Sequence, residues 1–273
     1  MKPKSSFLWI LAILLTFSIA YYQRVTGPTK PVTGKIKMEN KDIKFKLLRT
    51  ETTGKDAEIK FLTENVNIGG TIKYKRFKSN DEWTEEPMTY KDGYLIGLLP
   101  SQPPAGKIIY EVTLNTNGNS YPLTEEPVII RFKGDVPSIY LIPHIIFMVI
   151  VLLMAIRSGI QSIFVKEPST VFTNITFFAL ILGGCVFGPI VQKYAFGFYW
   201  TGFPFGHDFT DNKTAIAVLF WTIAAFMAWR KSKNTRWWVL AAAIVLLATY
   251  LVPHSVLGSE IDYTKQPKVE SNI

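Results

Sequence analysis

The chain has 273 residues, of which 48% are hydrophobic and 19% are charged, and its formal net charge is +9. A mean hydropathy of +0.17 over this length excludes intrinsic disorder, a disulfide-dense secreted scaffold and an ordinary water-soluble globule, because it requires several lipid-buried stretches. The single cysteine also excludes a disulfide, a CxxC metal site and a CxxCH haem attachment. The composition therefore predicts a membrane protein.

The excess of basic residues does not indicate a nucleic-acid partner. Residues 23–138 carry 18 basic and 15 acidic side chains, which alternate along the chain and form no block of a single sign. Most of the excess lies in the apolar remainder, where basic residues at helix ends set the orientation of a membrane protein. We therefore expect contact with a lipid bilayer and no nucleic acid.

The first apolar run, Phe7–Tyr22, follows the basic start MKPK. Its length fits either the core of a cleaved signal peptide or a short anchor helix, and both alternatives place the following residues outside the cytoplasm. The small residues SIA offer a cleavage site, whereas Tyr21 and Tyr22 are typical of an interfacial aromatic belt. We favour the second alternative, an uncleaved signal-anchor helix over residues 1–24.

Residues 25–135 predict an all-β domain. Seven short alternating segments, separated by turn formers such as Asp92-Gly93, are typical of strands with one buried face; they are GKIKM, DIKFKLL, AEIKFL, GTIKYKRF, YLIGLL, KIIYEVTL and PVIIRF. This number of strands is typical of an immunoglobulin-like sandwich. The stretch TEEPMTYKDGYLIGLLPSQPPAGKIIYEVTL resembles the fibronectin-III class, and this likeness of architecture implies no activity.

Residues 136–252 predict an all-α four-helix transmembrane bundle. The apolar runs 139–156, 171–191, 212–229 and 237–252 are each close to the roughly 20 residues that span a bilayer. Basic residues precede the anchor and lie after the first and third of these runs, so the positive-inside rule makes those three places cytoplasmic. We expect a multi-pass protein of a bacterial inner (plasma) membrane, with the β-sandwich and a tail of residues 253–273 outside, in the periplasm.

Three histidines, all on the expected outer face, are candidate ligands. His144 lies about one turn into the first of the four runs, His207 lies in the aromatic connection 192–213, and His254 follows the last run. Imidazoles from neighbouring helices can converge on a transition metal or a haem iron. Met148 lies on the same helical face as His144 and offers a soft sulfur ligand for a metal or haem cofactor.

Acidic residues near these histidines extend the candidate site. Asp208 is a further candidate metal ligand, and Asp211 and Glu260 are candidate acceptors that would fix the tautomer of a ligating imidazole. Thr210 or Asp211 is also a candidate N-cap of the helix that follows. Two narrower alternatives stay open at this stage, a site of His144 and His254 alone, and an aromatic belt that binds no ligand.

Small residues in the second of the four runs indicate close packing. Gly183-Gly184 and Gly188-Pro189 predict a close approach between helices and a kink, because small residues let backbones touch and proline removes a hydrogen bond. A broken helix at a transport site is the alternative. The runs carry no charged residue at mid-membrane depth, which favours packing over an ion pathway.

The blocks GPIVQKYAFGFYWTGFPFGHDFTDNK and LVPHSVLGSEIDY are similar to stretches of uncharacterised bacterial integral-membrane proteins. The resemblance covers about the last half of the chain, implies an envelope protein and supplies no activity. The first hypothesis is haem or transition-metal binding at a histidine-lined outer mouth, for electron transfer or metal handling. The second is a non-enzymatic envelope protein that binds a partner through the sandwich, and the third is a small-solute transporter.

Overall fold

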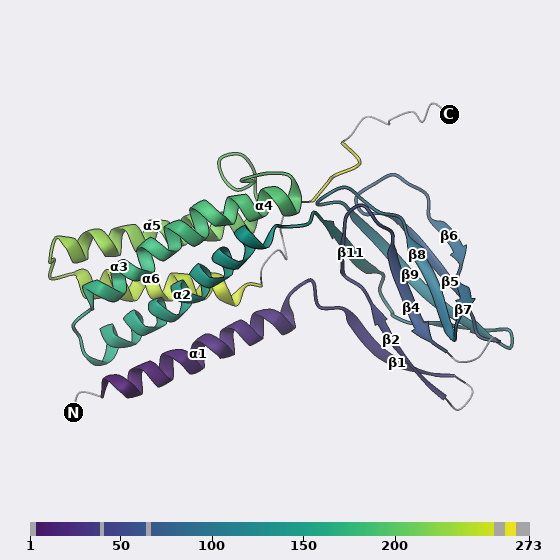
Figure 1. Ribbon diagram of the computed structural model, residues 1–273, viewed down its shortest axis with the longest axis horizontal. Coiled ribbons are helices and arrows are strands. Elements are labelled where there is room, and N and C mark those ends of the chain that lie inside the picture. Colours follow the sequence, from purple (N-terminus) through teal and green to yellow (C-terminus); the bar gives the residue numbers. More distant parts are fainter. Residues whose placement is uncertain (1–3, 39–40, 64–66, 254–259, 266–273) are drawn as a thin grey trace. The chain divides into compact units, whose positions relative to one another are not determined.

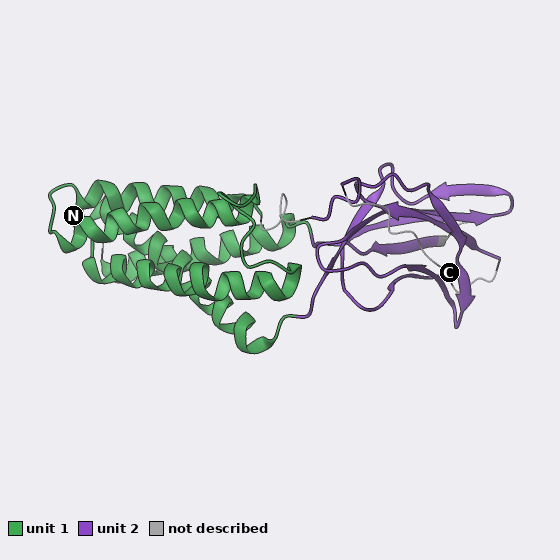
Figure 2. Cartoon of the chain, turned by 90° about the horizontal axis from the view of Figure 1, so that it is seen from above, with its two compact units in different colours: residues 1–28, 136–259 green, residues 29–135, 260–273 purple. Residues whose placement is uncertain are grey.

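The computed structural model describes residues 4–38, 41–63, 67–253 and 260–265. The chain divides into two compact units (Figure 2). Unit 1 comprises residues 1–28 and 136–259 and is helical, and unit 2 comprises residues 29–135 and 260–273 and is rich in strands. An N-terminal helix, a β-rich region and a set of helices thus follow one another as the sequence predicts.

The helices of unit 1 are long and apolar. They are α1 (Ser5–Thr26), α2 (Ser138–Phe164), α3 (Thr170–Leu180), the π-helix η1 (Ile181–Phe187), α4 (Gly188–Phe196), α5 (Phe209–Trp229) and α6 (Thr235–Leu251). Figure 1 labels the six α-helices. Among the described residues, four helical segments have the length and hydropathy of a membrane span: Ser5–Thr26, Ser138–Phe164, Thr170–Phe196 and Phe209–Trp229. The shorter apolar helix α6 is a fifth segment. These features are those of a multi-pass membrane protein.

Helix α1 packs into the helical unit. Leu8 and Ala12 are fully buried in the same apolar core as Trp221 of α5 and Leu246 of α6. Gln23, near the end of α1, donates a hydrogen bond to the backbone carbonyl of Tyr250 in α6. The bundle that the sequence predicts with four helices therefore includes α1 as well, because α1 carries an apolar face that the other helices bury.

Three of the predicted spans are longer than their apolar runs. Helix α2 continues through polar residues to Phe164, the segment from α3 through α4 ends at Phe196, and α5 already begins at Phe209. The residues of these extra turns are polar or aromatic, so they lie outside the apolar runs from which the spans were predicted. The predicted N-cap of α5 is wrong by two residues or more, since the carboxylate of Asp208 accepts hydrogen bonds from the backbone N–H groups of Thr210 and Asp211.

The described residues of unit 2 form three sheets. The strands β1 (Val32–Met38) and β2 (Lys41–Leu47) form a hairpin, and the strands β4 (Ala57–Leu62), β8 (Tyr94–Leu99) and β7 (Thr89–Lys91) pair in that order. The largest sheet has the order β3 (Thr50–Thr52), β11 (Val128–Lys133), β9 (Lys107–Thr116), β5 (Gly69–Arg76) and β6 (Thr84–Pro87), and β10 (Asn119–Pro122) pairs with β9. The seven predicted strands are confirmed as β1, β2, β4, β5, β8, β9 and β11.

Alternation along the strands builds the core of unit 2. Strands β4 and β9 alternate between buried and less buried positions along their whole length, as a sheet with one covered face requires. Tyr110 of β9 is completely buried, and its hydroxyl donates a hydrogen bond to the carbonyl of Leu48 over 2.8 Å. The hydrogen bond of Tyr110 therefore connects the end of β2 to a central strand of the largest sheet.

The chain returns to unit 2 after α6. Glu260 forms salt bridges with Lys78 and Lys107, and the hydroxyl of Tyr263 donates a hydrogen bond to Gln102 over 3.0 Å. The guanidinium of Arg76 lies 4.5 Å from the centre of the Tyr263 ring. Residues 260–265 of the predicted tail are therefore docked on the strands of unit 2, because their charged and aromatic side chains contact complementary partners there.

The docked segment is expected to loosen in acid. Burial raises the pKa of Glu260, but the hydrogen bonds and charges of Lys107 and Lys78 outweigh burial, so the pKa is lowered overall. Because the pKa of Glu260 is lower in the docked form, its carboxylate stabilises that form at pH values above the unfolded-state pKa of about 4.3. This stabilisation is lost as the pH falls through the folded-state pKa. The protection of residues 260–265 in the full chain, measured as the hydrogen-exchange rate relative to the intrinsic rate at each pH, should therefore decrease from about pH 4 downward. In Glu260→Gln the protection should be low already at neutral pH and nearly independent of pH in this window, and equal protection profiles for the two proteins would contradict the assignment.

Candidate functional site

The site is built around His144, which lies in the second turn of α2. Its Nδ1 is 2.9 Å from the carbonyl oxygen of Gly183 in the π-helix η1. Because a carbonyl oxygen only accepts hydrogen bonds, Nδ1 carries the proton and donates it. In the neutral ring the lone pair then resides on Nε2, the nitrogen that Gly183 does not use.

Local sequence explains why Gly183 comes so close to α2. A Cβ atom at Gly183 would lie 2.8 Å from Cβ of Phe147 and 3.1 Å from Sδ of Met148, so only glycine fits. Pro189, the second residue of α4, lacks an N–H group, and the chain before α4 widens into seven residues of π-helix. The carbonyl of Gly183 accepts both the N–H of Gly188 and the Nδ1–H of His144. The close packing predicted for these small residues is confirmed.

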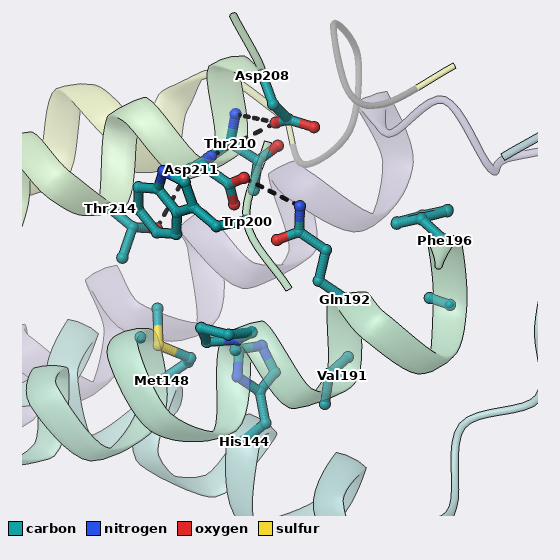
Figure 3. A pocket seen from close by; sticks show the side chains of 14 residues that line it. His144, Met148, Val191, Gln192, Phe196, Trp200, Asp208, Thr210, Asp211 and Thr214 are labelled. Atoms are coloured by element: carbon teal, nitrogen blue, oxygen red, sulfur yellow. Dashed lines mark hydrogen bonds between the residues drawn. The ribbon is translucent and has the colours of Figure 1, made fainter. Parts of the chain in front are cut away.

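His144 and Met148 form a common wall between two cavities. The first cavity, of about 110 Å³, lies beside α4 and the start of α5, and Gln192, Trp200 and Asp211 also line it (Figure 3). The second, of about 480 Å³, is a largely apolar groove between α1, α2 and Tyr250 of α6. The imidazole is thus placed where a small pocket that contains several polar side chains meets a larger apolar groove.

The carboxylate of Asp211 holds the aromatic connection against the bundle. Its Oδ2 accepts hydrogen bonds from the backbone N–H of Thr201 at 2.6 Å, the backbone N–H of Gly202 at 3.0 Å and Nε2 of Gln192 at 2.9 Å. Figure 3 shows Gln192 of α4 directed at this carboxylate. Asp211 is only 4% exposed, so water has little access to these donors. The carboxylate accepts their hydrogen bonds in place of water.

The aromatic side chains of this connection turn outward while its backbone is held inward. Phe203 and Phe205 are 77% and 83% exposed, whereas Gly202 is buried against Asp211 and Asn212. The side chain of Asn212 accepts a further hydrogen bond from the N–H of Phe203 over 2.7 Å. The connection therefore presents exposed aromatic rings on one side and a pocket wall on the other.

A buried lysine closes the same end of the bundle. Lys213 is 7% exposed, and its Nζ donates a hydrogen bond to the carbonyl of Val252, just after α6, over 2.9 Å. Its ammonium also lies 5.5 Å from the centre of the Phe209 ring. A cation at the last carbonyls of a helix is favourable because the C-terminal end of the helix carries partial negative charge. Lys213 therefore has a structural explanation in joining α5 to α6.

The structure brings together only some of the predicted site residues. His144, Met148, Asp208 and Asp211 line one cavity. His207 is exposed and does not line that cavity, and Glu260 belongs to unit 2, where it pairs with two lysines. His254 lies outside the described residues. Among the residues that the structure describes, no group of three or more histidine, cysteine or acidic side chains could hold a metal ion.

The predicted roles of the two aspartates differ from what they contact. Asp211 and Asp208 were expected to serve imidazoles or a metal, and both instead accept hydrogen bonds from the connection and from the start of α5. The carboxylates are buried beside backbone N–H groups, which satisfy them in place of an imidazole. The residues that the sequence did not indicate are Gln192 and Trp200 of the pocket, Thr201, whose hydroxyl accepts a hydrogen bond from Gln192, and Gln23 and Tyr250 of the groove. Isolated amide and aromatic residues in apolar helices give no spacing signal.

No protein-family model, curated protein or solved structure matches the chain.

Chemically, the arrangement offers one basic nitrogen at the edge of an apolar groove. With Nδ1–H donated to Gly183, Nε2 of His144 can accept a hydrogen bond from a ligand hydroxyl or bind a metal ion. The groove of about 480 Å³ has the size and apolar lining of a small-molecule site. The remaining polar side chains of the groove are Gln23, Thr16 and Tyr250, and each is engaged in a backbone hydrogen bond.

Proposed function

We propose that the protein is a membrane-embedded binding protein for a lipid-soluble molecule that carries a hydroxyl group. The hydroxyl would donate a hydrogen bond to Nε2 of His144, and the apolar body would lie in the groove between α1 and α2. The observation that supports this is the hydrogen bond from Nδ1 to Gly183, which orients the ring and leaves Nε2 as an acceptor. An apolar groove with one oriented polar group is the usual form of such a site.

A second candidate is the transition-metal site, and one observation favours it. Met148 lines the same two cavities as His144 and supplies the soft sulfur that copper prefers. Haem ligation by this pair is disfavoured, since side chains four residues apart project from one face of a helix and cannot bind opposite faces of a haem plane. A metal ion would need further coordinating atoms, which a bound small molecule or water would supply.

The proposed topology places unit 2 and the His144 end of the bundle outside the cytoplasm of a bacterial inner membrane. Three basic groups support this orientation under the positive-inside rule: Lys4 before α1, Lys166 between α2 and α3, and the basic residues from Arg230 to Lys233 between α5 and α6 together with Arg236 in the first turn of α6. Figure 1 draws these three places at one end of the helical unit. The packing of Leu8 and Ala12 in the core supports a retained anchor helix.

The strand order supports an immunoglobulin-like sandwich for unit 2. A three-stranded sheet β4-β8-β7 accompanies the order β3-β11-β9-β5-β6, in which β3 pairs in parallel with β11. Two sheets with such crossovers and a buried tyrosine on a central strand are typical of this class.

Extraction of purified protein tests the binding proposal. Full-length wild type, His144→Leu and His207→Leu would be purified in nanodiscs, and their small molecules and metals would be identified by mass spectrometry, elemental analysis and absorption. His207→Leu is the matched control, since it removes an exposed histidine that does not line the cavity. We expect one hydroxyl-bearing apolar compound in wild type and control that falls at least about tenfold in His144→Leu, a loss equivalent to about 1.4 kcal/mol.

Two outcomes would overturn this proposal. An identical set of lipids in all three proteins would exclude a ligand held by His144. A stoichiometric metal or a haem absorption band that disappears only in His144→Leu would establish the second candidate in its place.

A further inference from the structure

The other end of α2 borders a second hollow, and its lining is strongly basic. A cavity of about 520 Å³ lies between the connection of α2 to α3 and the connection of α5 to α6. Its basic lining residues are Lys166, Lys231, Lys233 and Arg236, and Glu167 is the acidic residue among those that line it. The hollow is separate from the site of His144 and shares no lining residue with it.

The four cations outnumber Glu167, the acidic residue that lines the hollow with them. The ion pairs recorded among the described residues all lie in unit 2, so none involves these side chains. Lys166, Lys231 and Lys233 are exposed at the hollow, where their charges repel one another. An anion bound between them would relieve that repulsion.

Local structure directs Arg236 and two helix ends toward the hollow. Nε of Arg236 donates a hydrogen bond to the carbonyl of Ser162 over 2.8 Å, which fixes the guanidinium at the cavity wall. Helix α6 begins at Thr235, and its N-cap residue Asn234 provides no side-chain hydrogen bond. Thr170, the first residue of α3, also lines the hollow. The partial positive charge of a helix N-terminus adds to that of the side chains.

Exposed aromatic residues place this hollow at the level of lipid headgroups. Trp237 lines it and is 60% exposed, and Trp229, at the end of α5, is 50% exposed. Phe164, at the end of α2, is 51% exposed. Aromatic rings at the ends of apolar spans lie at the membrane–water interface. A basic hollow at that depth lies closer to the phosphates of the adjacent leaflet than to anions in bulk water.

We propose that this hollow binds the phosphate headgroup of an anionic phospholipid. Lys231 and Lys233 supply charge from one connection, Lys166 supplies it from the other, and Arg236 offers the guanidinium geometry that suits a phosphate. Basic pockets between spans at a membrane surface recognise anionic headgroups in this way. The apolar flank formed by Trp237 receives the start of the acyl chains.

Lipid binding to the full chain tests this proposal. Purified protein in detergent would be titrated with phosphatidylglycerol or phosphatidylcholine, and bound lipid would be counted by native mass spectrometry. The variant Lys233→Gln/Arg236→Gln removes two charges from the hollow, and Lys231→Gln/Lys233→Gln removes two exposed charges without disturbing the bond to Ser162. The control Lys4→Gln/Arg230→Gln removes two charges at the same end from residues that do not line the hollow.

We expect wild type and control to bind phosphatidylglycerol with affinities within twofold of each other, and both hollow variants to bind it at least about tenfold more weakly. Equal affinity of the hollow variants and wild type would overturn the proposal, as would equal binding of phosphatidylcholine and phosphatidylglycerol to wild type. A third arm adds inorganic phosphate. Displacement of the lipid by millimolar phosphate would show that the site takes free phosphate instead, and would overturn the assignment to a lipid.

Discussion

Replacing Asp211 by alanine is expected to release the aromatic connection and to destabilise the helical unit. Three donors, the N–H groups of Thr201 and Gly202 and the side-chain amide of Gln192, would lose their common acceptor at a site with little access to water. Hydrogen bonds to charged groups contribute about 1.5–3 kcal/mol each, and unsatisfied buried donors add to the loss. We expect the free energy of unfolding to fall by about 3 kcal/mol or more.

Thermal unfolding in detergent measures this change, and proteolysis between residues 197 and 208 reports the release of the connection. Asp211→Asn retains an acceptor oxygen without the charge and should lie between wild type and Asp211→Ala. Asp135→Ala is the charge control, because this aspartate is exposed. A melting temperature and a cleavage pattern for Asp211→Ala that match those of Asp135→Ala would contradict the role assigned to this carboxylate.

Replacing Gly183 by valine is expected to separate η1 from α2 and to break the hydrogen bond that orients His144. The new side chain would begin 2.8 Å from Cβ of Phe147, closer than two carbon atoms can approach. Overpacking of this kind costs about 1–3 kcal/mol. The matched control is Val186→Leu, which adds volume in the same π-helix at a side chain that is 43% exposed.

Two measurements follow the Gly183→Val protein. Its melting temperature should fall by several degrees, and the compound that co-purifies with wild type should be lost, because the ring of His144 no longer has a fixed orientation. Val186→Leu should resemble wild type in both respects. Full retention of the ligand by a destabilised Gly183→Val protein would show that the bond to Gly183 does not orient the binding group.

The regular elements could be predicted from periodicity, and the short ones could not. Alternation in AEIKFL and KIIYEVTL reflects a sheet with one buried face, and β4 and β9 lie at those positions. The strand β3 has only three residues, and β7 has three as well, so neither carries a pattern. The pairing of β3 depends on β11, which lies far away in the sequence, whereas β7 pairs with β8, the next strand along the chain.

The candidate site was predicted in part. His144 and Met148 follow from helical spacing, since residues four apart share a face of α2. The role of Gly183 as an acceptor depends on η1, in which the backbone departs from the α-helical pattern that spacing assumes. Asp211 accepts hydrogen bonds from backbone N–H groups of the aromatic connection. Every residue except proline has such a group, so the sequence of the connection does not indicate which of them contact Asp211.

The protonation of His144 is the most direct test of the binding site. Nitrogen NMR of histidine-labelled protein would be recorded in the variant His207→Gln/His254→Gln, so that only His144 contributes. We predict a neutral ring with its proton on Nδ1 and an unprotonated Nε2 whose shift changes when the co-purifying compound is removed and restored. A ring with its proton on Nε2, or an Nε2 shift that is the same with and without that compound, would contradict the account of His144 as the ligand-binding group.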